Sequence, residues 1–375
     1  MSLAIAAYYF TFFGALGIFL PYFALWLTAR GLSPSEATRV LSLVPLTTLI
    51  APPLVGLVAD ARRARGWLLR GASVATCVAF VGLVVASGRP ALYLSTALFA
   101  LCRAPLTSLV DATTLDHVRH HGGSYGRIRL WGSLGFLVAA LGFGALAERV
   151  GIGVMPTTTT WALALAALCS FALPAPPLVE RAGVVGAWWK LVGDGESWLF
   201  FAAVALGYLA TSAYDSGFSM HLAHLGFGGR FIGAAWATGV AAEIVMMALS
   251  GAILARVGAA PLFAFSLATA TARWLLLSRV SSATAILLLQ PLHGVTFGLF
   301  WVAGVTLTRD RAGAAPTAAQ GLFAAALGVG SLVGMNVAGR LLEVGGGRLL
   351  YGAAAAAAAA ATACAVLYGR RSRIL

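Results

Sequence analysis

The chain has 375 residues, of which 60% are hydrophobic and only 10% charged, with a mean hydropathy of +0.90 and a formal net charge of +13. Soluble domains carry about a quarter charged residues, so this composition excludes a water-soluble fold. A strongly basic soluble protein would suggest a nucleic-acid partner. Here the Lys and Arg residues lie mostly in short polar breaks, which membrane topology explains better. We therefore expect a lipid bilayer, and no nucleic acid, as the surroundings of the chain.

Apolar runs of about 20 residues, each long enough to cross the hydrocarbon core as a helix, follow one another along the chain. The predicted spans are 4–28, 35–58, 67–87, 91–115, 127–149, 154–173, 198–222, 229–255, 261–280, 283–308, 317–342 and 349–368. The predicted fold is an all-α membrane protein with about twelve transmembrane helices. A β-barrel would show shorter segments of alternating polarity, which the sequence lacks. The first span lacks a basic flank and is too long for a cleaved signal peptide.

The longest polar break, residues 174–197, divides the spans into two halves of about six helices each, residues 1–173 and 198–375. Trp188 and Trp189 beside Lys190 are typical of a segment that lies in the membrane interface. Basic residues are more numerous on the side that holds the termini, so this linker and both termini are predicted to be cytoplasmic. A weak echo of residues 56–63 in residues 251–258 favours a repeat, although short loops often share Gly and Arg.

No cofactor, metal site or catalytic residue is expected. Cys77, Cys102, Cys169 and Cys364 lie in apolar runs without CxxC spacing or a neighbouring histidine cluster. The motifs GxSxG and HExxH, which would indicate an embedded hydrolase or metalloprotease, do not occur within the predicted helices, so an enzyme is not predicted. A receptor or scaffold would normally carry a sizeable soluble domain, and no polar break is long enough to hold one.

Ionisable side chains inside the predicted spans are the strongest functional signal. A charge at the bilayer centre costs about 2.5–3.5 kcal/mol, so such residues mark functional sites by default. The set consists of Arg103, Asp111, Arg129, Asp215, Glu243, Arg273 and His293. Two simpler interpretations remain open: buried ion pairs that only lock helices together, and, for Arg103, a side chain that reaches the interface. His293 is open in the same way, as a packing residue or a proton-coupled group.

Chain spacing suggests which of these residues share a depth in the membrane. Asp111 and Arg129 lie at equal distances from His120, where two spans turn, and Glu243 and Arg273 lie at equal distances from Gly258. Helices rise about 1.5 Å per residue, so the members of each pair should lie at similar depth. Spacing does not tell whether their side chains face each other. His117, His120 and His121 surround the first of these turns and are interpreted as a solvated loop.

Several segments resemble the major facilitator superfamily, and within it the 3-phenylpropionic acid permease branch, which is related to the oligosaccharide:proton symporters. The resemblance covers nearly the whole chain. It is carried by Gly56–Arg63, Phe19–Leu27, Pro105–Ala112, Tyr125–Ser133 and Leu292–Phe297. It implies the major facilitator fold of two six-helix halves. It also implies that Gly56, Asp60, Arg62 and Arg63 form the conformational loop motif between the second and third helices.

The resemblance further implies roles for the membrane charges. Asp111, Arg129 and His293 fall at substrate-binding positions, to which we add Arg103 and the aromatic Tyr22 and Trp26; Glu243, Arg273 and Asp215 fall at proton-coupling positions. Two departures matter. Thr296 replaces the acid that usually carries the proton in the lactose-permease group, and Gln290 replaces a lysine. If proton coupling exists, Glu243 or Asp111 must carry it.

The resulting hypothesis is proton-coupled uptake of a small polar or aromatic organic acid by alternating access. Protonation of Glu243 from outside precedes substrate binding between the halves, which then rock toward the cytoplasm. Burial favours the protonated form of a carboxyl group and a nearby arginine favours the ionised form, so movement of Arg273 would load and release the proton. The alternatives are uptake of a sugar or nucleoside, and efflux by antiport. The protein is expected in the inner (plasma) membrane as a functional monomer, with a small solute and protons as its partners.

Overall fold

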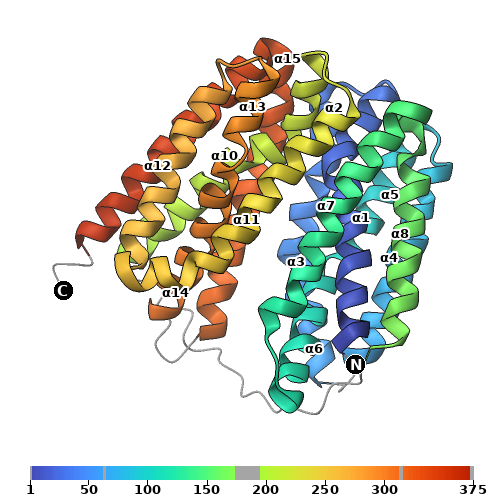
Figure 1. Cartoon of the computed structure of the whole chain (residues 1–375), viewed down its shortest axis with the longest axis horizontal. Helices are drawn as coiled ribbons and strands as arrows, with labels where there is room; N and C mark the ends of the chain where they lie inside the picture. Colours follow the sequence, from blue (N-terminus) through green and yellow to red (C-terminus); the bar gives the residue numbers. More distant parts are fainter. Residues whose placement is uncertain (1, 62–64, 174–194, 312–315, 372–375) are drawn as a thin grey trace. The chain divides into compact units, whose positions relative to one another are not determined.

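A computed structural model describes residues 2–61, 65–173, 195–311 and 316–371 (Figure 1). The described residues form helices joined by short turns and contain no strand. Of the predicted features, Arg62, Arg63 and most of the linker, with Trp188, Trp189 and Lys190, lie outside the described residues.

The outer ends of the helical stretches lie within a few residues of the predicted spans, but residues 104 and 105 interrupt the predicted span 91–115. The first set is α1 (Ser2–Ala29), α2 (Pro34–Leu41), α3 (Leu43–Ala61), α4 (Arg65–Val85), α5 (Gly88–Arg103), α6 (Leu106–His121), α7 (Tyr125–Val150), η1 (Ile152–Val154) and α8 (Met155–Phe171). The second set is α10 (Gly195–His224), α11 (Gly229–Val257), α12 (Ala259–Leu277), α13 (Ala283–Leu289), η2 (Gly294–Leu299), α14 (Phe300–Arg311) and α15 (Pro316–Arg371). The predicted all-α membrane fold is confirmed.

Among the described residues, ten helical stretches are long and apolar enough to cross a membrane. Two differences separate this number from the predicted twelve. Residues 316–371 run on as α15, but Gly345 and Gly346 have non-helical backbone angles and divide it into two arms. Gly346 has φ 59°, a conformation that glycine adopts without strain. The predicted span 35–58 corresponds to α2 and α3, which are broken at Ser42. Twelve spans therefore remain a prediction.

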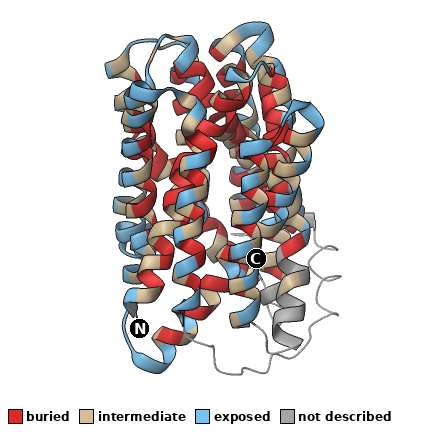
Figure 2. Cartoon of the chain, turned by 90° about the vertical axis from the view of Figure 1, so that its right-hand side faces the viewer, coloured by how far each residue is buried: buried red, intermediate tan, exposed pale blue. Residues whose placement is uncertain are grey.

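Large apolar side chains cover much of the exposed surface of the helices. Figure 2 shows buried and exposed faces along the same helices. Trp161 is 70% exposed and Leu288 is 72% exposed, and Val78 and Leu94 are similarly open. Soluble proteins rarely expose apolar patches this extensive, whereas a helix surrounded by lipid requires them.

The chain forms two compact units. Unit 1 consists of Met1–Leu32, Arg39–Arg181 and Gly226–Ala237, and unit 2 of Ser33–Thr38, Ala182–Leu225 and Thr238–Leu375. The units differ from the predicted halves by the two short segments at residues 33–38 and 226–237. The division into halves at residues 174–197 remains a prediction.

A glutamate binds the first turn of a helix in each of these short segments. Glu343 accepts hydrogen bonds from the Ser35 backbone N–H (2.8 Å) and from the Ser35 hydroxyl (2.7 Å). Glu148 accepts a hydrogen bond from the Arg230 backbone N–H (2.8 Å), and its other oxygen lies 3.1 Å from Arg230 Nε. Both carboxylates satisfy backbone donors that the first turn of a helix leaves free.

Within unit 1, α1 and α7 pack in close contact because glycines face each helix. A Cβ at Gly135 would overlap the Phe10 carbonyl oxygen, and a Cβ at Gly17 would overlap the carbonyl oxygen of Phe136. Small residues let transmembrane helices approach to backbone contact. This approach brings the side chains of α1 against the first turns of α7, where Arg129 lies.

Candidate functional site

In unit 1, the predicted residues Asp111 and Arg129 lie in one cluster that Tyr9 of α1 organises. The Tyr9 hydroxyl donates a hydrogen bond to Asp111 Oδ1 (2.5 Å) and accepts one from Thr114 Oγ1 (3.2 Å). The Arg129 guanidinium lies 5.4 Å from the centre of the Tyr9 ring and 3.9 Å from that of Phe13. Tyr9 therefore contacts both predicted residues, Asp111 through its hydroxyl and Arg129 through its ring.

Arg129 has an unusual environment for a membrane arginine. It is half-buried, and its planar guanidinium lies on two aromatic rings, an arrangement stabilised by cation–π attraction. No hydrogen bond or ion pair joins its N–H groups to another of the described side chains, Asp111 included. A guanidinium carries five N–H donors in a planar fork that matches a carboxylate. Arg129 can therefore bind an anionic group without losing an existing partner.

In unit 2, a proline breaks the helix over residues 283–311 and sets the direction of the polar side chains there. Pro291 has no N–H, so α13 ends at Leu289 and the chain tightens, with the Gln290 N–H bonded to Leu287 O and the His293 N–H to Gln290 O. The freed carbonyl of Ile286 accepts a hydrogen bond from Gln290 Nε2 (2.8 Å). A π-helix, η2, follows, and such segments occur frequently at functional sites.

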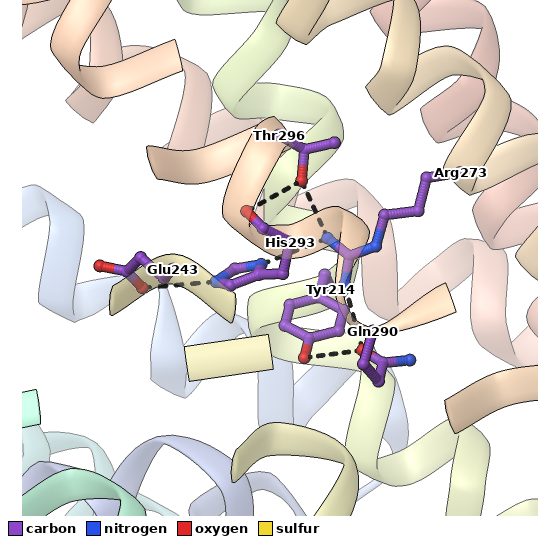
Figure 3. Close-up of polar contacts among 6 residues, drawn as sticks. All are labelled: Tyr214, Glu243, Arg273, Gln290, His293 and Thr296. Carbon is purple, nitrogen blue, oxygen red and sulfur yellow. Dashed lines mark hydrogen bonds and ion pairs between the residues drawn. The ribbon is translucent and has the colours of Figure 1, made fainter. Parts of the chain in front are cut away.

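Arg273 of α12 is fully buried and is the centre of the polar cluster in Figure 3. Its Nη1 lies 3.2 Å from His293 Nδ1 and donates to Thr296 Oγ1 (3.0 Å), and its Nη2 donates to Gln290 Oε1 (3.1 Å). The Tyr214 hydroxyl of α10 also donates to Gln290 Oε1 (3.2 Å). Arg273 is thus held by three neutral side chains rather than by a carboxylate, which leaves its positive charge uncompensated at close range.

Glu243 of α11 approaches this cluster through His293. A Cβ at Gly294 would lie 2.5 Å from the Ala242 carbonyl oxygen, so glycine at this position permits the contact between η2 and α11. Glu243 Oε2 lies 3.8 Å from His293 Nε2. Since His293 Nδ1 accepts from Arg273, the ring proton of the neutral imidazole belongs on Nε2, facing Glu243. His293 therefore lies between Glu243 and Arg273 and contacts both.

The remaining membrane charges are less closely engaged. Asp215 follows Tyr214 on α10, is half-buried and lies within electrostatic range of Arg273. Arg103 ends α5 immediately before the break at Ala104 and Pro105, and no described side chain joins it to Asp111. The structure therefore does not bring Arg103 into the cluster around Tyr9.

The two predicted aromatic residues of α1 lie elsewhere in unit 1. The Tyr22 hydroxyl donates to the carbonyl oxygens of Ala140 (2.9 Å) and Gly229 (3.0 Å), so it joins helices. Trp26 is buried under the guanidinium of Arg30, which lies 5.0 Å from its ring centre. Tyr22 is thirteen residues from Tyr9, about 20 Å along the helix. Neither residue therefore belongs to the Arg129 cluster.

Two of the predictions concern loops, one around His120 and one at residues 56–63. His117 and His121 lie in the last turns of α6 with their rings stacked at 4.6 Å, and His117 is buried, so the expectation of a solvated loop is wrong for His117. Both residues are part of the helix rather than of a loop, and the stacked His121 ring covers one side of His117. In the conformational loop motif, Gly56 and Asp60 lie in α3, and Arg62 and Arg63 lie outside the described residues.

Sequence reasoning missed the neutral partners of the two arginines. Tyr9 and Phe13 are one helical turn apart on α1, a spacing that places both rings on one face, but nothing in the sequence indicated that this face meets Arg129. Gln290 and Thr296 drew notice only as departures from the lactose-permease pattern, yet both accept hydrogen bonds from Arg273. Pro291, next to Gln290, was the available signal of a helix break.

The described residues hold no group of three or more His, Cys, Asp and Glu side chains that could bind a metal ion. Their polar clusters are instead built from arginines, carboxylates and aromatic rings. This chemistry suits binding of organic solutes and transfer of protons.

Known proteins resemble this chain in sequence. The model of the MFS_1 like family matches residues 2–353. Maltose permease of Geobacillus stearothermophilus is 30% identical over 274 residues, 72% of this chain and 68% of the permease. The "Probable 3-phenylpropionic acid transporter" of Escherichia coli K12 is 27% identical over 338 residues, 88% of each chain.

Solved structures agree on the fold. The structure of the nucleoside transporter NupG superposes with a TM-score of 0.84 and 17% identity, covering 98% of both chains. A likeness at this identity speaks for the fold alone. The named relatives are transporters rather than enzymes. The chain belongs to the MFS_1 like family and is a multi-pass secondary transporter of the major facilitator superfamily.

Proposed function

We propose that this transporter takes up a small aromatic carboxylate together with protons. The observation that carries the proposal is Arg129, half-buried on the rings of Phe13 and Tyr9 with its N–H donors unused by the described side chains. A carboxylate would take a bidentate contact from the guanidinium, and an aromatic ring would add to the existing stack. The relative named for 3-phenylpropionic acid supports this substrate class.

Glu243 is proposed as the proton carrier. Of the acids in the described clusters of unit 2, it lies nearest the His293 ring, 3.8 Å from Nε2, and His293 in turn contacts Arg273. A buried carboxyl group is most stable when protonated, and approach of a positive charge favours proton release. Small shifts of His293 and Arg273 relative to Glu243 would therefore switch its affinity for a proton during the transport cycle. Asp215 is the second candidate carrier, because it also lies in range of Arg273.

A sugar is the second candidate substrate, and Asp111 favours it. Carboxylates accept hydrogen bonds from sugar hydroxyls, and aromatic rings such as Tyr9 stack on sugar faces. The identity to maltose permease supports this alternative. Nucleoside uptake and export of amphiphiles are the remaining alternatives. An anionic substrate needs the charge of Arg129, whereas a neutral sugar needs mainly its donors, so the two classes respond differently when that charge is altered.

The test is uptake into proteoliposomes under an imposed pH gradient. Radiolabelled 3-phenylpropionate, maltose and uridine are compared one at a time, with and without a protonophore. We expect accumulation of 3-phenylpropionate that the protonophore abolishes. Glu243→Gln mimics a permanently protonated carboxyl group, so gradient-driven accumulation should fall by about a hundredfold or more.

Asp310→Asn is the matched control, because Asp310 is an exposed acid whose loss also removes one negative charge. It should transport like the parent protein. Accumulation of maltose or uridine instead of 3-phenylpropionate would refute the substrate class. Coupled uptake that survives Glu243→Gln would refute the proton role of this residue while leaving the substrate assignment intact.

The membrane orientation is part of the same proposal. The excess of basic residues on one side places both termini and the segment at 174–197 in the cytoplasm of a cell with an inner (plasma) membrane. In this orientation α10 starts at the cytoplasmic side and ends, at His224, outside. Gly56, Asp60, Arg62 and Arg63 are proposed to control the conformational change, and the protein is proposed to act as a monomer.

A further inference from the structure

Four buried side chains of unit 2 carry polar atoms that have no hydrogen-bond partner among the described residues. The atoms are both ring nitrogens of His221, the Tyr351 hydroxyl, the Trp274 indole nitrogen and Arg273 Nε. His221 is 6% exposed and the other three are at most 1% exposed. A buried polar atom without a partner costs about 1–3 kcal/mol, and such atoms normally bind ordered water.

These side chains touch one another and form a single row. The Arg273 guanidinium lies 4.6 Å from the ring centre of Trp274. The ring centres of Trp274 and Tyr351 are 6.0 Å apart, and those of Tyr351 and His221 are 5.4 Å apart. The row thus connects α12, α15 and α10 through consecutive contacts, so its unpaired atoms belong to one region.

One end of the row reaches the proposed proton site, and the other lies near the end of α10. His221 is one turn from His224, which is exposed and ends the helix. Tyr214 lies two turns earlier on the same face, about 10 Å deeper, and its ring centre is 4.7 Å from the Arg273 guanidinium. The row therefore spans the distance between an exposed helix end and the cluster that holds His293 and Glu243.

The bend of α15 lies at the outer end of the row. A Cβ at Gly347 would overlap the His221 ring, so only glycine admits the imidazole there. The two preceding residues, Gly345 and Gly346, leave the helical conformation, and a Cβ at Gly346 would meet nothing within 4 Å. The non-helical backbone and the open space at Gly346, one residue before the glycine that contacts His221, provide a way for water to enter at this end.

We propose that bound water molecules occupy this row and form the route by which protons pass Arg273 and reach His293 and Glu243 from the aqueous phase beyond His224. This inference rests on the proposed proton coupling. A neutral imidazole presents one donor and one acceptor, so its ligand must both accept and donate, as water does and a simple anion does not. About three or four water molecules at ordinary hydrogen-bond spacing bridge the distance. In the proposed orientation the route opens to the outside.

The charged and titratable groups along the route are few. His224 stands at its open end, where Glu343 and Arg348 flank the glycines of the bend, Arg273 stands at its inner end, and Asp215 and Glu243 lie beyond Arg273. Tyr351 and His221 lie between them. Because the row of described side chains from His221 to Arg273 contains no acid, water rather than a chain of carboxyl groups must carry the proton past Trp274.

The first test measures hydration without measuring transport. A 4-cyanophenylalanine at position 351 places a nitrile where the Tyr351 hydroxyl lies, and its infrared stretch moves to higher frequency when water donates a hydrogen bond to it. The matched reference is the same amino acid at position 263, because Phe263 is fully buried in the apolar core of unit 2. We expect a hydrogen-bonded nitrile at 351 and an unbonded one at 263. A dry nitrile at 351 in folded protein would overturn the proposal.

The second test asks whether protons use the route. His221→Leu should reduce gradient-driven uptake of 3-phenylpropionate on the order of tenfold, because it removes both polar atoms next to the bend. Exchange of internal for external solute without a gradient needs no net proton movement and should be unchanged. His221→Gln keeps a donor and an acceptor at this position and should restore most of the gradient-driven uptake.

The outcomes separate this inference from the proposed function. If the parent protein shows no proton-driven uptake at all, the proposed coupling fails and the route has no proton to carry, although a hydrated nitrile would still locate the water. If the parent protein is coupled and His221→Leu transports normally, the coupling stands and the route is refuted. Equal loss of exchange and of gradient-driven uptake would likewise refute a specific role in proton access.

Discussion

The arginines of the two units differ in how completely the protein uses their hydrogen-bonding groups. Arg129 in unit 1 is half-buried on two aromatic rings and binds no described polar side chain. Arg273 in unit 2 is fully buried and reaches His293, Thr296 and Gln290. A cation with unused donors is suited to a ligand that comes and goes. A cation enclosed by fixed partners is suited to controlling the charge of its neighbours.

The carboxylates associated with these two arginines, Asp111 and Glu243, also differ in how tightly they are held. Asp111 accepts a short hydrogen bond from Tyr9, so its position is set by a tyrosine that also supports Arg129. Glu243 Oε2 lies 3.8 Å from His293 Nε2, a longer contact than the one between Tyr9 and Asp111 (Figure 3). A contact at that distance can close into a hydrogen bond, or open again, with little rearrangement, which suits a proton carrier.

The largest expected effect comes from removing the side chain of Arg273. Arg273→Gln should lower the free energy of unfolding by about 3 kcal/mol, because His293, Thr296 and Gln290 lose a buried donor. Transport should be lost as well. The measurement is the thermal midpoint of detergent-solubilised protein, with Arg279→Gln as control, since Arg279 is exposed near the end of the same helix. Equal midpoints for the two variants would show that Arg273 is not a structural element.

The substitution Arg129→Lys tests whether the arginine of unit 1 serves solute binding rather than stability. Lysine keeps the charge but loses the planar fork and its stacking, so affinity for a carboxylate solute should fall about ten- to hundredfold, or 1.4–2.7 kcal/mol. The unfolding midpoint without solute should fall only slightly, because the cation–π contact weakens but no described hydrogen bond is lost. Solute-induced stabilisation reports the affinity. Arg127→Lys, an exposed position on the same helix, should behave like the parent protein, and a drop in intrinsic stability for Arg129→Lys as large as that for Arg273→Gln would contradict the assignment.

The smallest expected effect distinguishes two neighbouring tyrosines. Tyr9→Phe removes the hydrogen bond to Asp111, and Tyr8→Phe removes the 2.9 Å bond between Tyr8 and Ser73. Each should cost about 1 kcal/mol of stability. Only Tyr9→Phe should weaken solute binding, since Asp111 then loses the hydrogen bond that positions it near Arg129. Identical binding curves for the two variants would place Asp111 outside the solute site.

Hydropathy and residue spacing predicted the helices well, because a lipid environment allows few alternatives for an apolar run of this length. Spacing also placed Asp111 with Arg129, and Glu243 with Arg273, at common depths. It could not predict which way each side chain points around its helix. The roles of Tyr9 and of His293 as intermediaries depend on that direction.

Two residues that depart from the lactose-permease pattern, Gln290 and Thr296, are hydrogen-bond partners in the structure. Gln290 and Thr296 stand where a lysine and an acid were expected, and both accept hydrogen bonds from Arg273. A comparison of sequence patterns detects the missing charges but not the hydrogen bonds that the new side chains form. That geometry follows from Pro291, whose missing N–H frees the turn that presents Gln290.

The wide turn at residues 294–299 has one more consequence. A π-helical turn holds about one residue more than an α-helical turn, so it offsets the angular register between the two parts of this span. His293 can therefore point at Arg273 while Phe300 and Leu307 remain in the apolar core of unit 2. Deleting a single residue within this turn would return the span to uniform pitch. The imidazole would then rotate by about 100° relative to α14, and Glu243 would lose its neighbour while the lipid-embedded core stayed packed.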